Sequence, residues 1–200
     1  GLISAVGEWV LRKTCEAYMA NQSYLPDDFL MAVNLSGRQF KGNLLVNFIR
    51  NLLEQTGMPA KNLELEITES LLMENTEQAV QTLRELSLLG ITLAIDDFGT
   101  GYSSLSYLKQ FPLNVLKIDR TFVRDVTEDS DDAAIVNAIL AMSNSLALEV
   151  VAEGVETAEQ LAFLRKSQCK RAQGFYFSKA IDLNDLMDYI KQTDQDVRAV

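Results

Sequence analysis

Six short hydrophobic runs in this sequence each end in a polar side chain of a type that can bind a metal ion or move a proton. In chain order these polar residues are Asn34, Glu66, Asp96, Lys117, Glu153 and Gln173. Side chains alternate between the faces of a strand, so each run has one aliphatic face for covering helices and one that ends in the polar group. In a (β/α) barrel such groups converge on one mouth, whereas a doubly wound sheet would scatter them along an open edge.

The chemistry that these residue types favour is metal-assisted hydrolysis. The residues that offer only oxygen ligands are Asn34, Glu66, Asp96 and Asp97. Oxygen ligands suit Mg²⁺ or Mn²⁺, and the adjacent Asp96 and Asp97 would let two ions share a bridging carboxylate. Paired ions clamp the attacking and leaving oxygens in phosphodiester hydrolysis. Glu153 could then remove a proton from the attacking water, while Lys117 could orient that water or offset phosphate charge.

A structural role is the alternative for each of these residues. A carboxylate just after a strand is often a helix cap or a turn residue. Six polar strand ends in succession favour a site, because each displaces an apolar residue from a readily buried position. Lys117 lies inside an otherwise apolar strand and needs a partner, which neighbouring carboxylates would supply. The glycine-rich segment 97–104 fits either a phosphate-contacting loop or a plain flexible βα loop.

The composition narrows the chemistry further. The chain has 200 residues, a formal net charge of -10 and no histidine. The charge argues against binding DNA or RNA, and the lack of imidazole excludes the usual serine and cysteine triads and histidine zinc sites. Cys15 and Cys169 fit buried apolar positions in a reducing compartment. No run approaches the roughly 20 apolar residues that span a bilayer. We therefore expect a cytoplasmic domain without membrane contact, whose parent protein can still carry an anchor elsewhere.

The elements that must position the polar residues alternate between helix and strand, which is typical of parallel βα units. The expected strands are 31–35, 63–67, 91–95, 115–118, 149–152 and 171–173. The expected helices are 3–21, 44–56, 76–89, 104–109 and 132–146, one that opens at Thr157, and a last one that carries Leu183, Leu186 and Ile190. Two Asx/Thr-x-x-Gln patterns, at Asn75 and at Thr157, resemble capping boxes. The fold class is therefore α/β.

Six strings, in order and over nearly the whole chain, resemble the signature series of the EAL domain family. They are Val33-Asn34-Leu35-Ser36, Glu66-Ile67-Thr68-Glu69, Asp96-Asp97-Phe98-Gly99-Thr100-Gly101, Leu116-Lys117-Ile118-Asp119, Ala152-Glu153-Gly154-Val155-Glu156 and Gln173-Gly174. The resemblance implies a modified TIM barrel that hydrolyses cyclic di-GMP to linear pGpG, with one or two Mg²⁺ or Mn²⁺ ions.

The resemblance also implies a role for each matching residue. Its metal ligands are Asn34, Glu66, Asp96 and Asp97. Its general base is Glu153, and Lys117 positions the water. Glu69 resembles the glutamate that holds the loop after Asp97, while Gln173 and Glu156 match positions near the substrate guanine or the metal site.

The sequence also departs from the family pattern. The Glu-Ala-Leu motif and the arginine after it are absent, and Ala180 stands where proline is usual. A typical barrel has about 250 residues. We therefore expect residues 1–192 to be a partial EAL domain that lacks about the first two strands and one metal-ligating glutamate, followed by a polar C-terminal tail at 193–200. Such a fragment is expected to be inactive and to leave strand edges unpaired, which favours instability or a swapped dimer.

Three hypotheses on function follow from the sequence. The first is an enzyme that hydrolyses cyclic di-GMP in second-messenger signalling. The second is a catalytically silent module that binds cyclic di-GMP or regulates a partner. The third is a scaffold whose polar strand ends only stabilise the fold. The family resemblance further implies a homodimer and an upstream sensor or GGDEF-type domain in the parent protein.

Overall fold

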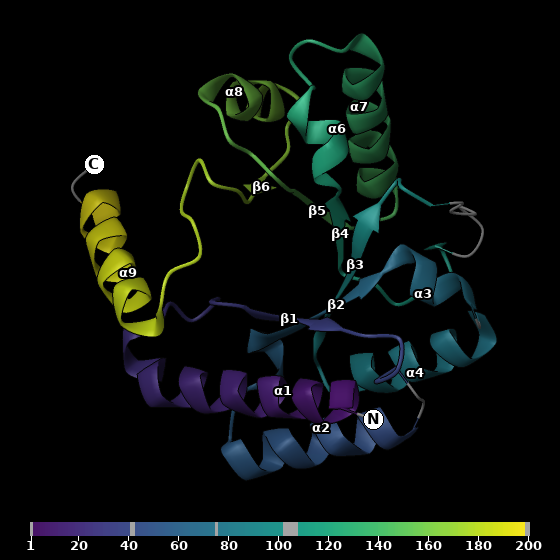
Figure 1. Ribbon diagram of the computed structural model, residues 1–200, viewed down its shortest axis with the longest axis vertical. Helices are drawn as coiled ribbons and strands as arrows, with labels where there is room; N and C mark the ends of the chain where they lie inside the picture. Colours follow the sequence, from purple (N-terminus) through teal and green to yellow (C-terminus); the bar gives the residue numbers. More distant parts are fainter. Residues whose placement is uncertain (1, 41–42, 75, 102–107, 199–200) are drawn as a thin grey trace.

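Six parallel strands form one sheet in the computed structural model of the chain, which describes residues 2–40, 43–74, 76–101 and 108–198 (Figure 1). The strands are β1 (Met31–Leu35), β2 (Leu63–Thr68), β3 (Thr92–Phe98), β4 (Val115–Ile118), β5 (Glu149–Ala152) and β6 (Arg171–Ala172). Their order in the sheet is the order in the chain, so each strand pairs with the next through a helical crossover. The predicted α/β class is confirmed, and the bounds predicted for β1, β4 and β5 are correct.

The helices precede, connect and follow the strands, and most of them cover the aliphatic face of the sheet. They are α1 (Leu2–Asn21), α2 (Asn43–Thr56), α3 (Glu69–Glu74), α4 (Thr76–Leu88), α6 (Arg120–Arg124), α7 (Ser130–Ser145), α8 (Ala158–Lys166) and α9 (Leu183–Arg198), with short 3₁₀ turns at Gln22–Tyr24 and Ala60–Asn62. The α3 and α6 helices were not predicted, because one or two turns are too short to show a helical period. The α9 helix continues to Arg198, through most of the segment expected to be a tail. The expected helix at 104–109 and the cap residue Asn75 lie largely or wholly outside the described residues.

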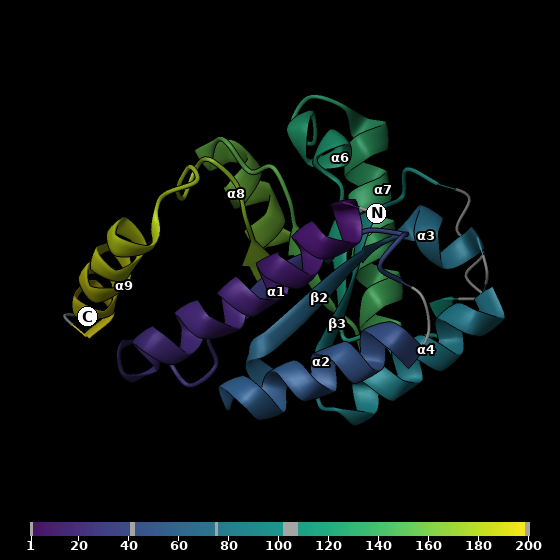
Figure 2. The same cartoon turned by 60° about the horizontal axis from the view of Figure 1, so that its bottom comes forward.

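The core lies between the sheet and these helices. On β2, Leu63, Leu65 and Ile67 are fully buried on one face, while Glu64 and Glu66 lie on the other. The same alternation holds on β3 and β4, where the core residues are Leu93, Ile95, Leu116 and Ile118. Figure 2 shows α2 and α4 side by side against this part of the sheet. The inner face of the sheet is therefore free to carry polar side chains.

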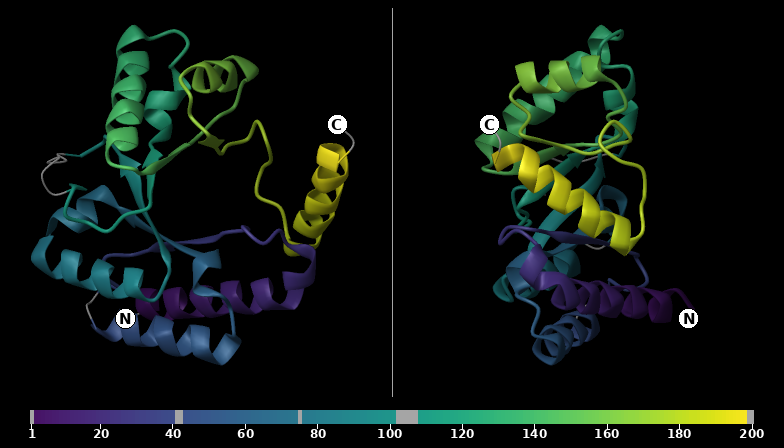
Figure 3. Two further views of the ribbon diagram at one scale, coloured as in Figure 1. Left: turned by 180° about the vertical axis from the view of Figure 1, so that it is seen from behind. Right: turned by 90° about the vertical axis from the view of Figure 1, so that its left-hand side faces the viewer.

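The sheet has two ends, β1 and β6, and no pairing joins them in the part of the chain that the structure describes. The helices α1, α2 and α4 accompany the β1–β3 half, and α6, α7 and α8 accompany the β4–β6 half. The α9 helix stands apart from α8 at the end of a long connection (Figure 3). The architecture is thus that of a modified TIM barrel whose six strands do not close a ring.

Local sequence signals explain several boundaries. The predicted capping box at the start of α8 is present: the Thr157 hydroxyl accepts from the Gln160 backbone, and the Gln160 side chain accepts from the Thr157 backbone. Cys15 is fully buried in α1 as predicted, but Cys169 is only partly buried, because it lies in the turn between α8 and β6. Among the residues described, no helix combines the length and apolar character needed to cross a bilayer.

Substitution by glycine at two helix ends is predicted to stabilise the protein. Ala147, after α7, and Gln168, after α8, are exposed and have φ of 57° and 63°, a left-handed conformation that costs an L residue energy. We expect Ala147→Gly and Gln168→Gly each to raise the free energy of unfolding by about 0.5–1 kcal/mol, measured by urea denaturation. The control Ala162→Gly, at an exposed position inside α8, should lower it by a similar amount. A loss of stability in the first two variants would contradict the prediction.

Candidate active site

The polar residues of the inner face meet around Lys117. Its ammonium nitrogen lies 2.5 Å from Glu66 Oε1, 2.6 Å from Glu153 Oε1 and 3.5 Å from Asp96 Oδ1. The lysine is 4% exposed, so these contacts are made away from bulk water. The parallel register produces this convergence, because β2, β3, β4 and β5 are adjacent and each presents its inner residue at the carboxyl end.

A β-bulge on β3 brings two successive carboxylates to the same site. The β3–β4 register runs from Ile95 opposite Leu116 to Phe98 opposite Ile118, so β3 contains one extra residue. Asp97 lies in this bulge with φ of 54°, and its backbone N–H donates to Asp96 Oδ1 at 3.0 Å. In a regular strand the two side chains would point to opposite faces. The bulge therefore allows Asp96 and Asp97 to act together.

The resulting set of oxygens fits a hard divalent cation. Asp96, Asp97 and Glu153 each offer a carboxylate oxygen, and these three atoms lie within 4.8 Å of one another. Glu66 is linked to this group by its contact with Lys117. Asn34 lies opposite Glu66 in the β1–β2 register, and the Asn34 side chain is exposed. Carboxylate and amide oxygens are the ligands that Mg²⁺ and Mn²⁺ prefer. The negative charge of this cluster exceeds the single charge of Lys117, which favours a further cation.

Electrostatic balance within the cluster follows from burial and from Lys117. Burial alone would lower the pKa of the Lys117 ammonium, but hydrogen bonds to Glu153 and Glu66 outweigh it and raise the pKa. Burial raises the pKa of Glu153, although contact with Lys117 works in the opposite direction. Lys117 is thus charged at all physiological pH values, and Glu153 is a stronger base than an exposed glutamate.

Asp119 belongs to the site, although the sequence analysis gave it no role. It is 9% exposed, and its carboxylate caps α6 by accepting hydrogen bonds from the backbone N–H and the hydroxyl of Thr121. Burial, the negative charge of Asp96 and a shared hydrogen bond with Asp119 raise the pKa of Asp97. Burial would raise the pKa of Asp119, but the hydrogen bonds from Thr121 outweigh burial and lower this pKa. The signal in the sequence was its place on the same strand face as Lys117.

Glu69 lies behind the bulge and contacts the glycine-rich loop. It is 1% exposed, and its Oε2 accepts from the backbone N–H of Gly99 at 3.0 Å. A Cβ on Gly101 would lie 2.5 Å from Glu69 Oε1, so a larger residue there would displace the Glu69 carboxylate. Glu69 thereby links the start of α3 to the loop that follows Asp97.

The end of β6 supplies the last contact. Gln173 donates from Nε2 to Glu153 Oε1 at 2.6 Å, and its carbonyl accepts from the Val155 backbone at 3.0 Å. Glu156 does not join the cluster: its side chain is exposed, and its backbone N–H donates to Gln160. The structure therefore brings Gln173, but not the side chain of Glu156, into contact with Glu153.

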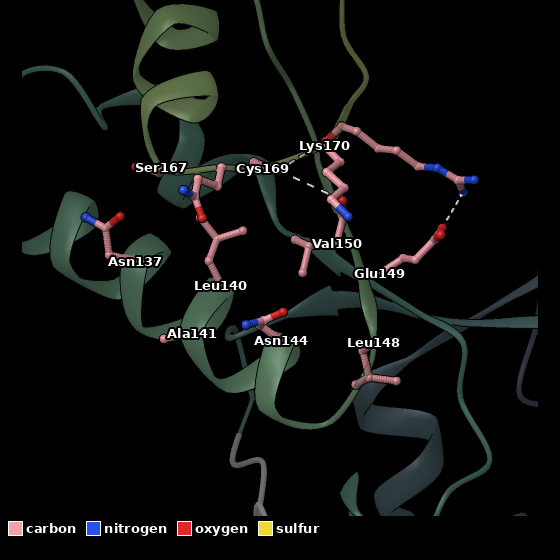
Figure 4. Close-up of a pocket in the computed structure, with 12 residues that line it drawn as sticks. Asn137, Leu140, Ala141, Asn144, Leu148, Glu149, Val150, Ser167, Cys169 and Lys170 are labelled. Atoms are coloured by element: carbon pink, nitrogen blue, oxygen red, sulfur yellow. Dashed lines mark hydrogen bonds and ion pairs between the residues drawn. The ribbon is translucent and has the colours of Figure 1, made fainter.

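A cavity of about 500 Å³ on the inner face is lined by Glu66, Lys117, Gln173 and Phe177 among others, and Lys117 connects it to Asp96 and Glu153, which do not line it. Another cavity, of about 520 Å³, lies on the outer side between α7 and the α8–β6 turn (Figure 4). Its lining is rich in amides, such as Asn137 and Asn144, and includes none of the predicted site residues. The inner cavity is therefore the candidate active site.

Parallel β/α units whose strands end in a group of oxygen ligands are typical of a TIM-barrel-like protein, and Asp96, Asp97 and Glu153 could hold a metal ion there. The chain belongs to the EAL domain family, because the family model described as EAL domain matches residues 1–180. This confirms the resemblance seen in the sequence.

Three named relatives are similar to most of the chain. Cyclic di-GMP phosphodiesterase NbdA of Pseudomonas aeruginosa is 44% identical over 191 residues, which cover 96% of this chain and 24% of that protein. The PaMucR phosphodiesterase in a c-di-GMP complex is 44% identical with a TM-score of 0.89, covering 93% of this chain and 75% of that one. Klebsiella pneumoniae BlrP1 in a manganese and cy-diGMP complex is 31% identical with a TM-score of 0.75. The similarity covers 84% of this chain and 43% of the BlrP1 chain. The chain spans about a quarter of the length of the curated relatives it matches.

The buried Glu64 is predicted to lower the free energy of unfolding as the pH rises. It is 6% exposed on the inner face of β2, and burial followed by repulsion from Glu66 raises its pKa from 4.5 to about 6. Between these values the folded chain binds more protons than the unfolded chain, so this group's contribution to stability is lost as pH rises through the window. Glu64→Gln should therefore be more stable than wild type by about 2 kcal/mol at pH 7.5 and nearly equal at pH 4.5.

The measurement is urea unfolding in EDTA across this pH range. The exposed Glu159→Gln is the matched control, since it removes the same charge from the first turn of α8. A difference between Glu64→Gln and wild type that does not change with pH would show that burial does not perturb Glu64.

Proposed function

We propose that the domain to which this chain belongs hydrolyses cyclic di-GMP to linear pGpG in a metal-dependent reaction, as part of second-messenger signalling. The observation that carries the proposal is the buried contact of Lys117 with Glu66, Asp96 and Glu153 on the inner face. The names of the relatives NbdA and PaMucR support cyclic di-GMP as the substrate.

The residues that would hold one or two Mg²⁺ or Mn²⁺ ions are Asn34, Glu66, Asp96 and Asp97. A bound divalent ion lowers the pKa of its water and offsets the charge of the phosphodiester. This neutralisation is essential, because a dianionic substrate would otherwise meet a cluster of carboxylates.

Glu153 is the proposed general base. It would take a proton from the attacking water while the water oxygen bonds to phosphorus and one P–O ester bond breaks. Lys117 and Gln173 both contact Glu153 Oε1 and so hold this carboxylate in one orientation. If Glu66 held a cation, the Lys117 ammonium would orient the water or face the phosphate oxygens. Gln173 and Glu156 are proposed to lie near the substrate guanine or the metal site.

The setting of the domain is also a proposal. The MucR relative is a bifunctional diguanylate cyclase/cyclic di-GMP phosphodiesterase, which supports an upstream GGDEF-type or sensor domain in the parent protein. A cytoplasmic location and a homodimer remain proposals from the family. We further propose that residues 1–192 act as one EAL unit.

Glu153→Gln is the direct test of the base. In the full-length protein with Mn²⁺, the substitution should lower kcat at least about a hundredfold, because a positioned base typically contributes that much. The variant should still bind cyclic di-GMP, which calorimetry would measure. The exposed Glu159→Gln should hydrolyse the ligand like wild type. Undiminished turnover in Glu153→Gln would refute the assignment, and binding without turnover in the wild type would favour the silent binding module.

The 200-residue chain on its own should hydrolyse negligible cyclic di-GMP with either Mg²⁺ or Mn²⁺. The physical reason is that β1 has no second neighbour in the described sheet, so the cup stays open beside the exposed Asn34. Product formation by chromatography, with the full-length protein as reference, measures this directly. Robust hydrolysis by the isolated chain would mean that these six strands suffice for catalysis.

A further inference from the structure

The proposed general base Glu153 opens the turn after β5, residues 153–156, which we call the base turn. The residue after β6, Gln173, is bonded to both sides of Glu153. The Gln173 backbone N–H donates to the Ala152 carbonyl at 2.9 Å, and the Gln173 carbonyl accepts from the Val155 backbone N–H at 3.0 Å. The Gln173 side chain donates to Glu153 Oε1 at 2.6 Å. The backbone pairing therefore sets where the Gln173 amide meets the carboxylate.

Gly174 allows the end of β6 and the base turn to come this close. A Cβ on Gly174 would lie 2.2 Å from the Val155 carbonyl oxygen and 2.3 Å from the Val155 nitrogen. Both are backbone atoms, and the Val155 carbonyl also accepts from the Tyr176 backbone N–H at 2.9 Å, so neither can turn aside as a flexible side chain would. A side chain at position 174 would therefore force the two segments apart.

The base turn cannot retreat from such a side chain, because α6 packs against its other side. The α6 helix follows β4, and in the sheet β4 and β6 flank β5. A Cβ on Gly154 would lie 2.5 Å from Arg120 Cβ, so the turn already lies against the first residue of α6. The buried Gln160 side chain accepts from the Glu156 backbone N–H at 2.7 Å and donates to the Arg124 carbonyl at 2.9 Å. A separation would therefore move the segment after β6.

We propose that Gly174 is a positioning residue for the general base Glu153. Its missing side chain lets the end of β6 close on Val155, and this closure keeps the Gln173 amide on the Glu153 carboxylate. The inference rests on the proposed function, since it assumes that Glu153 takes the proton from the attacking water. Catalysis tolerates little displacement of such a group, because a misplacement of about 1 Å can cost roughly a hundredfold in rate.

The test measures kcat and KM for cyclic di-GMP in the full-length protein with Mn²⁺. Gly174→Ala should lower kcat about ten- to a hundredfold with little change in KM, because a misplaced base affects the transition state more than the bound ligand. Gln173→Met, which removes the donor to Glu153, should also lower kcat. The double variant should be no slower than the slower single variant, because both changes break the same contact. Losses that multiply would show that Gly174 acts only on the fold, and would overturn the inference.

Gly90→Ala is the matched control for stability. Gly90 lies after α4 with φ of 87°, and a Cβ there would meet Ala60 Cβ at an ordinary 3.7 Å. Alanine at this position should therefore lower the midpoint of thermal unfolding through its left-handed backbone and leave kcat unchanged. A fall in kcat in Gly90→Ala as large as in Gly174→Ala would mean that lost stability explains both variants.

Glu153→Gln separates the failure of this inference from the failure of the proposed function. Loss of turnover in Glu153→Gln, with wild-type kcat in Gly174→Ala or in Gln173→Met, would overturn the role of Gly174 alone. The Gln173→Met result decides this even if Gly174→Ala does not fold. Undiminished turnover in Glu153→Gln, or no turnover by the wild-type protein, would overturn both proposals.

Discussion

The structure depends most on one buried ammonium group. Lys117, inside an otherwise aliphatic strand, makes contacts of 2.5–3.5 Å with carboxylates from β2, β3 and β5. Taking a charge out of water costs several kcal/mol unless a partner and hydrogen bonds compensate it. The lysine and the carboxylates therefore stabilise one another, and neither could occupy the inner face alone. The same clustering of negative charge makes the inner face suitable for a divalent cation.

The fold supplies the precision that this cluster needs. Parallel strands in sequential order bring the carboxyl ends of β2 to β5 together, and the buried aliphatic face fixes their register against slippage. The bulge on β3 then adds what a regular strand cannot, two successive aspartates at one site. Glu69 holds the loop after Asp97 through the Gly99 backbone, and the Asp119 carboxylate is held by the Thr121 hydrogen bonds at the start of α6.

The alternation of residue types predicted the strands, their buried faces and the convergence of Glu66, Asp96, Lys117 and Glu153, because these follow from a period of two and a parallel topology. The bulge was not predictable, since Asp96-Asp97 fits a regular strand equally well. Asp119 was missed because its role depends on contact with Asp97 across two strands. The role of Glu156 stays a prediction, because its side chain is exposed and its position depends on the path of the turn after β5.

The central claim is that Asp96, Asp97, Glu66 and Asn34 share a divalent cation beside Lys117. Crystals of the full-length protein grown with Mn²⁺, with anomalous diffraction recorded at the manganese edge, test it most directly. The account predicts an anomalous peak within about 2.0–2.3 Å of an Asp96 carboxylate oxygen, in the range of metal–oxygen bonds. A fully occupied manganese peak outside this cup, with Lys117 still bridging Glu66 and Glu153, would contradict it.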